Sequence, residues 1–131
     1  MNKVAVFSLK KFDRSLIKDI KNYGFKIVNK NPDFIISVGG DGTFLLSEKK
    51  YPGIPKLLLR NSEICYHCSN KDIKTMLKRI SKDEFKFVTL GKIKTDKGNL
   101  IAVNDIIIRN VNQREALRFS LMINNKSKYH E

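Results

Sequence analysis

The chain has 131 residues, 41% of them hydrophobic, which suits one globular domain or one domain with part of a second. No apolar run approaches the roughly 20 residues of a membrane helix, and the first residues enter a strand pattern without a signal peptide, so we expect a cytoplasmic protein with no membrane partner. The net charge of +13 suits a polyanionic ligand, but the lysines are scattered as on solvated faces, which argues against specific nucleic-acid binding.

The first third of the sequence alternates strand and helix patterns. Residues 3–9 predict a strand, and Asp13 can cap the following helix, which Gly24 ends. Residues 25–28 and 33–38 predict two further strands. This order predicts a parallel sheet with helices packed on it.

Three glycines surround one aspartate directly after the strand expected at 33–38. Glycine allows a positive φ and a close approach to a ligand, and a strand-to-helix turn directs N–H groups at one point, which suits phosphate. A phosphate would repel an acidic side chain in this turn unless that side chain binds a metal or accepts a proton. We therefore interpret Gly39, Gly40, Gly42 and Thr43 as a phosphate loop and Asp41 as a catalytic group. The alternative is a tight turn whose aspartate caps a helix.

The α/β pattern continues beyond this loop. A short helix is expected at 44–50 and a strand at 54–59, and Ser69 and Asp72 stand at capping-box spacing before a helix with an apolar stripe.

Cys65 and Cys68 form a CxxC pair. A structural zinc site needs four ligands, so we favour two buried reduced thiols over metal or redox use and expect no bound metal of this kind.

From about residue 84 the helices stop. Residues 85–89, 100–108 and 117–123 carry apolar residues in strand-like patterns, which predicts the start of an antiparallel sheet. We therefore expect an α/β domain at 1–83, followed by an incomplete all-β domain at 84–131. Three strands with one apolar face are barely enough to be stable alone.

Two polar residues, Asn104 and Asp105, interrupt the apolar run at 100–108. Burying them unpaired would cost several kcal/mol, so a ligand with hydroxyl groups could satisfy them. A hairpin bend or bulge at the same place would explain them equally well.

The sequence GGDGT at 39–43, followed by an apolar strand with Ala102-Val103-Asn104-Asp105, resembles the NAD kinase family. GGDGT alone is shared with lipid kinases, and the Asn-Asp pair favours NAD kinase. The resemblance implies transfer of the γ-phosphoryl of ATP, with Mg²⁺, to the 2′-hydroxyl of the adenosine ribose of NAD. It implies that Asp41 is the general base and that Asn104 and Asp105 hold hydroxyl groups of NAD.

The chain departs from the family pattern in two places. The family's Asn-x-Gly turn before Gly-Phe is replaced by residues 60–63 and then Cys65-Tyr66, and a later glycine- and threonine-rich segment has no match. We therefore expect a truncated relative or half of a split enzyme, completed by a homo-oligomer or a second chain. The alternatives are a nucleotide-binding module without activity and a lipid kinase.

Overall fold

The computed structural model describes residues 1–61, 63, 65–69, 71–96, 100–112 and 114–130. The chain divides into two compact units, Met1–Thr89 and Leu90–Glu131, and each is described by itself. The first unit is an α/β sheet flanked by helices, and the second contains antiparallel strand pairs. The fold class expected from the sequence is therefore confirmed. The predicted boundary between residues 83 and 84 stays a prediction.

Four parallel strands form the centre of the first unit. They are β1 (Lys3–Ser8), β2 (Lys26–Ile27), β3 (Phe34–Gly39) and β4 (Lys56–Arg60), in the order β2-β1-β3-β4. The chain crosses from β1 to β2 in one direction and from β3 to β4 in the other, so the winding reverses between β1 and β3. In open parallel sheets, ligands bind beyond the carboxyl ends of the strands at such a reversal.

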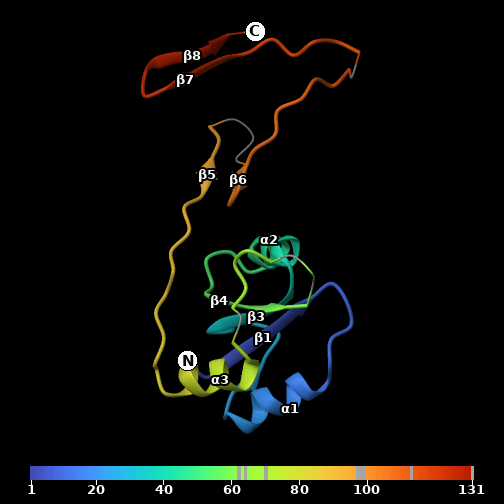
Figure 1. The fold of residues 1–131 in the computed structure, drawn as a ribbon, viewed down its shortest axis with the longest axis vertical. Coiled ribbons are helices and arrows are strands. Elements are labelled where there is room, and N and C mark those ends of the chain that lie inside the picture. The colour runs from blue at the N-terminus through green and yellow to red at the C-terminus, as the bar shows by residue number, and fades with distance from the viewer. Residues whose placement is uncertain (62, 64, 70, 97–99, 113, 131) are drawn as a thin grey trace. The chain divides into compact units, whose positions relative to one another are not determined.

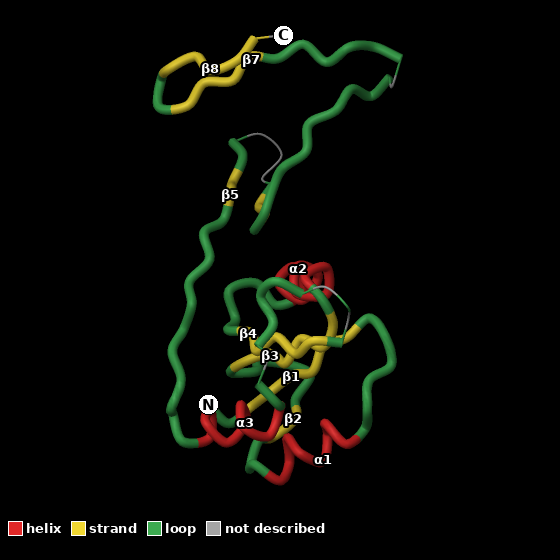
Figure 2. Tube along the Cα trace, in the orientation of Figure 1, coloured by secondary structure: helices red, strands yellow, loops and turns green. Residues whose placement is uncertain are grey.

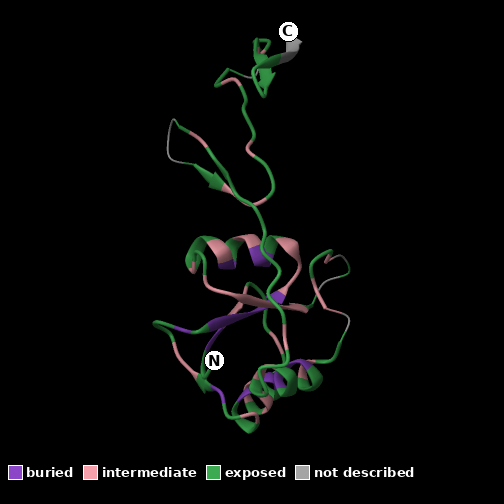
Figure 3. Ribbon diagram, turned by 90° about the vertical axis from the view of Figure 1, so that its left-hand side faces the viewer, coloured by how far each residue is buried: buried purple, intermediate pink, exposed green. Residues whose placement is uncertain are grey.

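Helices cover both faces of this sheet (Figures 1 and 2). α1 (Ser15–Asn22) and α3 (Ile73–Ser81) pack on one face, and α2 (Asp41–Lys50) packs on the other. Because β3 is covered on both sides, its sequence is apolar almost throughout rather than alternating. Figure 3 shows the buried residues concentrated on the central strands and on the helix surfaces that turn toward them.

The main core lies between the sheet and the pair α1 and α3. It consists of buried side chains from β1, α1, β3 and α3 and from the residue directly before β2: Val4, Leu16, Ile20, Phe25, Phe34, Ile36, Val38 and Leu77. The stripe predicted on α3 belongs to this core, as expected. Hydrophobic burial of this kind contributes roughly 1.5–3 kcal/mol per large side chain.

The ends of the helices confirm two predictions and correct one. Gly24 follows α1 with a φ of +83° and donates its N–H to Lys21 O, as expected of a glycine at a helix C-terminus. Asp13 accepts the Ser15 N–H at 2.9 Å and so caps the first turn of α1, as expected, while Arg14 between them already has helical φ and ψ. The capping box at Ser69 is wrong, because Asp72 is itself the N-cap of α3.

The second unit contains two separate antiparallel pairs. β5 (Ile93–Lys94) pairs with β6 (Ile101–Ala102), and β7 (Ser120–Ile123) pairs with β8 (Lys126–His130). Asn124 and Asn125 have φ of 51° and 59°, the two positive values that a type I′ hairpin turn requires. The strands expected at 85–89 and along most of 100–108 are wrong, since β6 ends at Ala102. The sequence did not predict β8.

Among the described residues, no helix combines the length and the apolar character needed to cross a membrane.

Candidate functional site

Asp41 lies where the central strand β3 passes into α2. β3 ends at Gly39, and Gly40 is the N-cap of α2 in an extended conformation with no side-chain cap. The helix was expected to start at residue 44, but it starts at Asp41, so Asp41, Gly42 and Thr43 form its first turn. The N–H groups of a first helical turn have no intrahelical acceptor. Because α2 follows β3 directly, these N–H groups lie at the carboxyl edge of the sheet, next to the point between β1 and β3 where the winding reverses.

The glycines of the loop do not adopt the positive φ that was expected of them, and their role in binding phosphate stays a prediction. Among the described residues, the glycines with positive φ are Gly24 and Gly53, so none of the loop glycines uses that freedom. A Cβ on Gly39 would lie 2.1 Å from Thr43 Oγ1, so residue 39 has no room for a side chain. Gly42 has no such neighbour within 4 Å. Thr43 is buried, with its hydroxyl turned to Gly39.

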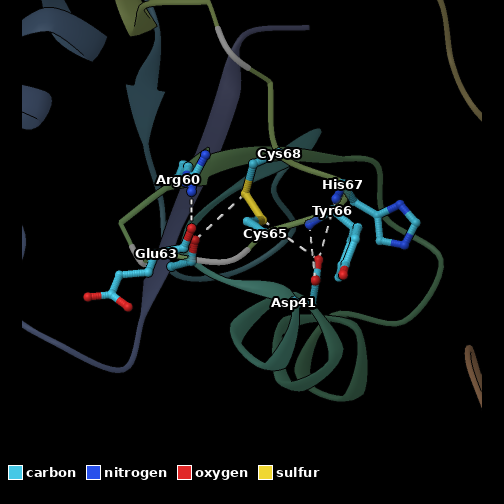
Figure 4. The surroundings of a disulfide bond; sticks show 8 residues. Asp41, Arg60, Glu63, Cys65, Tyr66, His67 and Cys68 are labelled. Carbon is cyan, nitrogen blue, oxygen red and sulfur yellow. Dashed lines mark hydrogen bonds between the residues drawn. A yellow bond between two sulfur atoms is a disulfide. The ribbon is translucent and has the colours of Figure 1, made fainter.

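The carboxylate of Asp41 is contacted by a loop that follows β4 (Figure 4). Its Oδ2 accepts the Tyr66 N–H at 3.1 Å and its Oδ1 accepts the His67 N–H at 3.4 Å. The His67 ring also lies 6.0 Å, between centroids, from the ring of Phe44 on α2. Asp41 thus joins the first turn of α2 to the loop at 65–68, here called the CYHC loop.

A disulfide joins the two ends of the CYHC loop. Cys65 and Cys68 are bonded to each other, with 5.4 Å between their Cα atoms, so the expectation of two reduced thiols is wrong. Both cysteines are half-buried. Cys65 Sγ lies 3.7 Å from Asp41 Oδ1, and Cys68 Sγ lies 3.7 Å from Gly39 O. Because neither sulfur carries a proton in the disulfide, these are contacts rather than hydrogen bonds.

A hollow opens on the α1 and α3 side of the same sheet edge. It has a volume of about 570 Å³, within the range of roughly 300–1,000 Å³ that small-molecule sites occupy. Val38 and Leu59 form part of its apolar wall, and Asn61, Lys71 and Asp72 are among its polar residues. The Asn61 N–H donates to Gly39 O at 3.2 Å, which connects the wall of the hollow to the glycine loop.

Asn104 and Asp105 belong to the second unit. They follow β6 instead of lying within a strand, and both are exposed. The expectation that the sheet buries them is therefore wrong, and their binding of a ligand stays a prediction. Their approach to Asp41 stays a prediction, because Asp41 lies in the other unit.

Two features of the site could not be expected from the sequence. The amide donors to Asp41 come from the backbone of Tyr66 and His67, which carries no sequence signal. The hollow depends on how the segments after β1 and β4 and the first residues of α1 and α3 converge on the sheet. Among the described residues, no group of three or more His, Cys, Asp or Glu side chains is arranged to hold a metal ion.

This is an open parallel α/β sheet with an acid at its winding reversal, next to the first turn of a helix. No known protein-family model matches the chain. Part of the chain is similar to an NAD kinase of Streptococcus gordonii, with 44% identity over 54 residues that cover 37% of this chain and 20% of that protein. The chain thus matches about a fifth of the length of this curated relative.

Proposed function

We propose that the chain carries the phosphoryl-transfer half of an NAD kinase. The observation that carries the proposal is Asp41, an acid in the first turn of α2 at the carboxyl end of the central strand. The local similarity to an NAD kinase supports the same reaction. In this reaction the γ-phosphoryl of ATP moves to the 2′-hydroxyl of the adenosine ribose of NAD and gives NADP.

The first turn of α2 would hold the phosphates. The N-terminus of α2 presents its N–H groups and the positive end of its dipole at this edge of the sheet. The residues there are Gly39, Gly40, Gly42 and Thr43. Gly42 leaves open space beside the backbone, which favours close approach of a phosphate oxygen. Mg²⁺ would enter with ATP and neutralise phosphate charge. The nearby hollow is large enough for part of a nucleotide.

Asp41 would accept the proton of the attacking 2′-hydroxyl. A carboxylate offers acceptor positions beyond the two that the Tyr66 and His67 amides use. General-base assistance of this kind contributes about 10²–10⁴-fold in rate. Positioning of the two substrates must supply much of the remainder.

Asn104 and Asp105 would bind the hydroxyl groups of NAD. Both side chains are exposed, which leaves their polar atoms accessible to a ligand. A carboxylate that accepts two adjacent ribose hydroxyls selects a sugar and disfavours free phosphate. We propose that a second copy of the chain, or another chain, completes the wall of this site.

The test is NADP formation from NAD, ATP and Mg²⁺ by the full chain, combined with thermal unfolding in the presence of millimolar NAD. We expect turnover and a higher Tm, because a ligand stabilises the state that it binds. A higher Tm without turnover would show a nucleotide-binding module instead. Phosphorylation of a diacylglycerol in place of NAD would show a lipid kinase.

A further inference from the structure

The CYHC loop lies directly on the group that the proposed reaction needs. Two consecutive backbone amides, Tyr66 N–H and His67 N–H, donate to the Asp41 carboxylate, one to each oxygen. A substrate hydroxyl would have to come within about 2.6–3.2 Å of the same oxygens. The loop therefore competes with a substrate for the space around Asp41 (Figure 4).

The disulfide closes the loop that carries these amides. A parallel bridge between Leu59 and Ser69 fixes the chain on either side of the CYHC loop, and the bond between Cys65 and Cys68 joins the two ends of the loop. Ordering a residue's backbone has an entropic cost, and a covalent link that closes the loop reduces that cost. Tyr66 and His67 are themselves exposed, so little side-chain burial keeps the loop against Asp41.

We propose that Cys65 and Cys68 form a reversible dithiol–disulfide site whose oxidised state covers Asp41 and whose reduced state releases it. The CxxC spacing next to a βαβ unit is that of redox-active cysteine pairs. The reduced thiols would have Asp41 Oδ1 and Gly39 O near them, but a thiol is a weak donor and does not restore the closed loop.

The chemistry requires an external dithiol as the reductant. A thiolate of that dithiol attacks one sulfur of the disulfide, the bond between Cys65 and Cys68 breaks, and the other cysteine leaves as a thiolate. The second thiol of the reductant then attacks the mixed disulfide and frees the first cysteine. Two electrons pass to the protein, both cysteines become protonated thiols, and the reductant becomes a disulfide.

The first test needs no kinase activity. Amide hydrogen exchange of Tyr66 and His67 is measured in the oxidised full chain, after treatment with dithiothreitol, and in the Cys65→Ser, Cys68→Ser double variant. We expect exchange roughly tenfold faster in the reduced chain and in the variant. The amides of Ile35 and Ile36 in β3 serve as the internal control and should not change. Equal exchange of the loop amides in all three samples would overturn the inference.

The second test rests on the proposed function. NADP formation by the oxidised chain should rise severalfold with dithiothreitol, and the double variant should match the reduced rate with or without it. Faster exchange with no NADP in any sample would contradict the proposed function and leave the redox site standing. Turnover that dithiothreitol leaves unchanged in the wild type would overturn the control of Asp41 by the disulfide.

Discussion

At the scale of single residues, the loop at 39–43 shows two different uses of glycine. Gly39 is required by packing, because the Thr43 hydroxyl occupies the position that a Cβ would take. Gly42 has open space beside it, so packing does not require a glycine there, and the proposed phosphate binding gives the reason for one. The sequence predicts the loop as a unit but cannot distinguish these two uses, since both depend on the start of α2 at Asp41.

Two alanine substitutions separate the roles of these glycines. Gly39→Ala should destabilise the chain by roughly 1–3 kcal/mol, because its Cβ overlaps Thr43. Gly42→Ala should keep or raise stability, by up to about 1 kcal/mol, since alanine favours a helix over glycine. Urea unfolding measures both, and NADP formation should nevertheless fall in Gly42→Ala. A Gly39→Ala chain as stable as the wild type would contradict the packing argument.

Asp33 gives the fold a defined sensitivity to acid. Its Oδ2 accepts the N–H groups of Lys3 and Asn2 at 2.9 and 2.7 Å, and these bonds hold the pKa of Asp33 below its ordinary value of 3.8. A lowered pKa in the folded state gives stability that is complete above 3.8 and is lost as the pH falls through the lowered value.

Asp33→Asn should therefore lower Tm at pH 7 and lose this difference from the wild type in acid. The reason is that the wild-type carboxyl becomes neutral there, as the amide is at every pH. Thermal unfolding of both proteins between pH 7 and pH 2 measures the effect. A difference in Tm that stays constant over this range would show that the charge of Asp33 does not contribute.

At the scale of elements, a buried ion pair joins α2 to β4 on one face of the sheet. Lys56 Nζ contacts Glu48 Oε2 and donates to the carbonyls of Tyr51 and Ile54 at 2.8 Å each. The Lys56 and Glu48 side chains are only 4% and 14% exposed. Removing one partner from such a pair leaves a buried charge without its counter-ion.

Glu48→Ala should cost about 3–5 kcal/mol of unfolding free energy, measured with urea. Adding Lys56→Met to this variant should recover part of the loss, because it removes the charge that was left alone. Lys49→Ala, at an exposed position of the same helix, is the control and should change stability by less than about 0.5 kcal/mol. A loss in Glu48→Ala no larger than in the control would contradict the importance of the pair.

The elements also show where the sequence was informative. Residues 1–60 carry clear strand and helix periods, and β1, β3 and the core face of α1 follow them. Residues 100–108 have the composition of a strand, yet β5 offers a partner to Ile101 and Ala102 alone among the described residues. Ile107 and Ile108 stay exposed, because strand propensity without a pairing edge does not make a strand.

In the candidate site too, the sequence predicts what is local and misses what depends on contacts between distant segments. Asp41 was predicted because its signal is local: a strand, glycines and an acid in one stretch. The disulfide was not predicted, since one CxxC pattern fits thiols, a metal site and a redox pair. The amides that contact Asp41 come from residues 66 and 67, a connection that only the folded chain makes.

At the scale of the whole molecule, the residues proposed to bind NAD and to react with it are divided between the two units. Asp41 belongs to the first unit, and Asn104 and Asp105 belong to the second. If Asn104 binds the sugar of NAD, Asn104→Ala should raise the KM for NAD roughly tenfold, because the variant loses one to two hydrogen bonds to the ligand. Steady-state kinetics with NAD varied measures this effect, and Asn110→Ala is the matched control. An unchanged KM would remove Asn104 from the site.

The proposed transfer of the substrate hydroxyl's proton to Asp41 is tested by the rate of the chemical step in Asp41→Asn. The measurement is single-turnover formation of NADP by the dithiothreitol-treated chain. Asparagine keeps the size of the side chain, so Tm should move by only a few degrees, and the rate should fall by about 10²–10⁴-fold. A folded Asp41→Asn chain that forms NADP at the wild-type rate would show that Asp41 does not accept this proton.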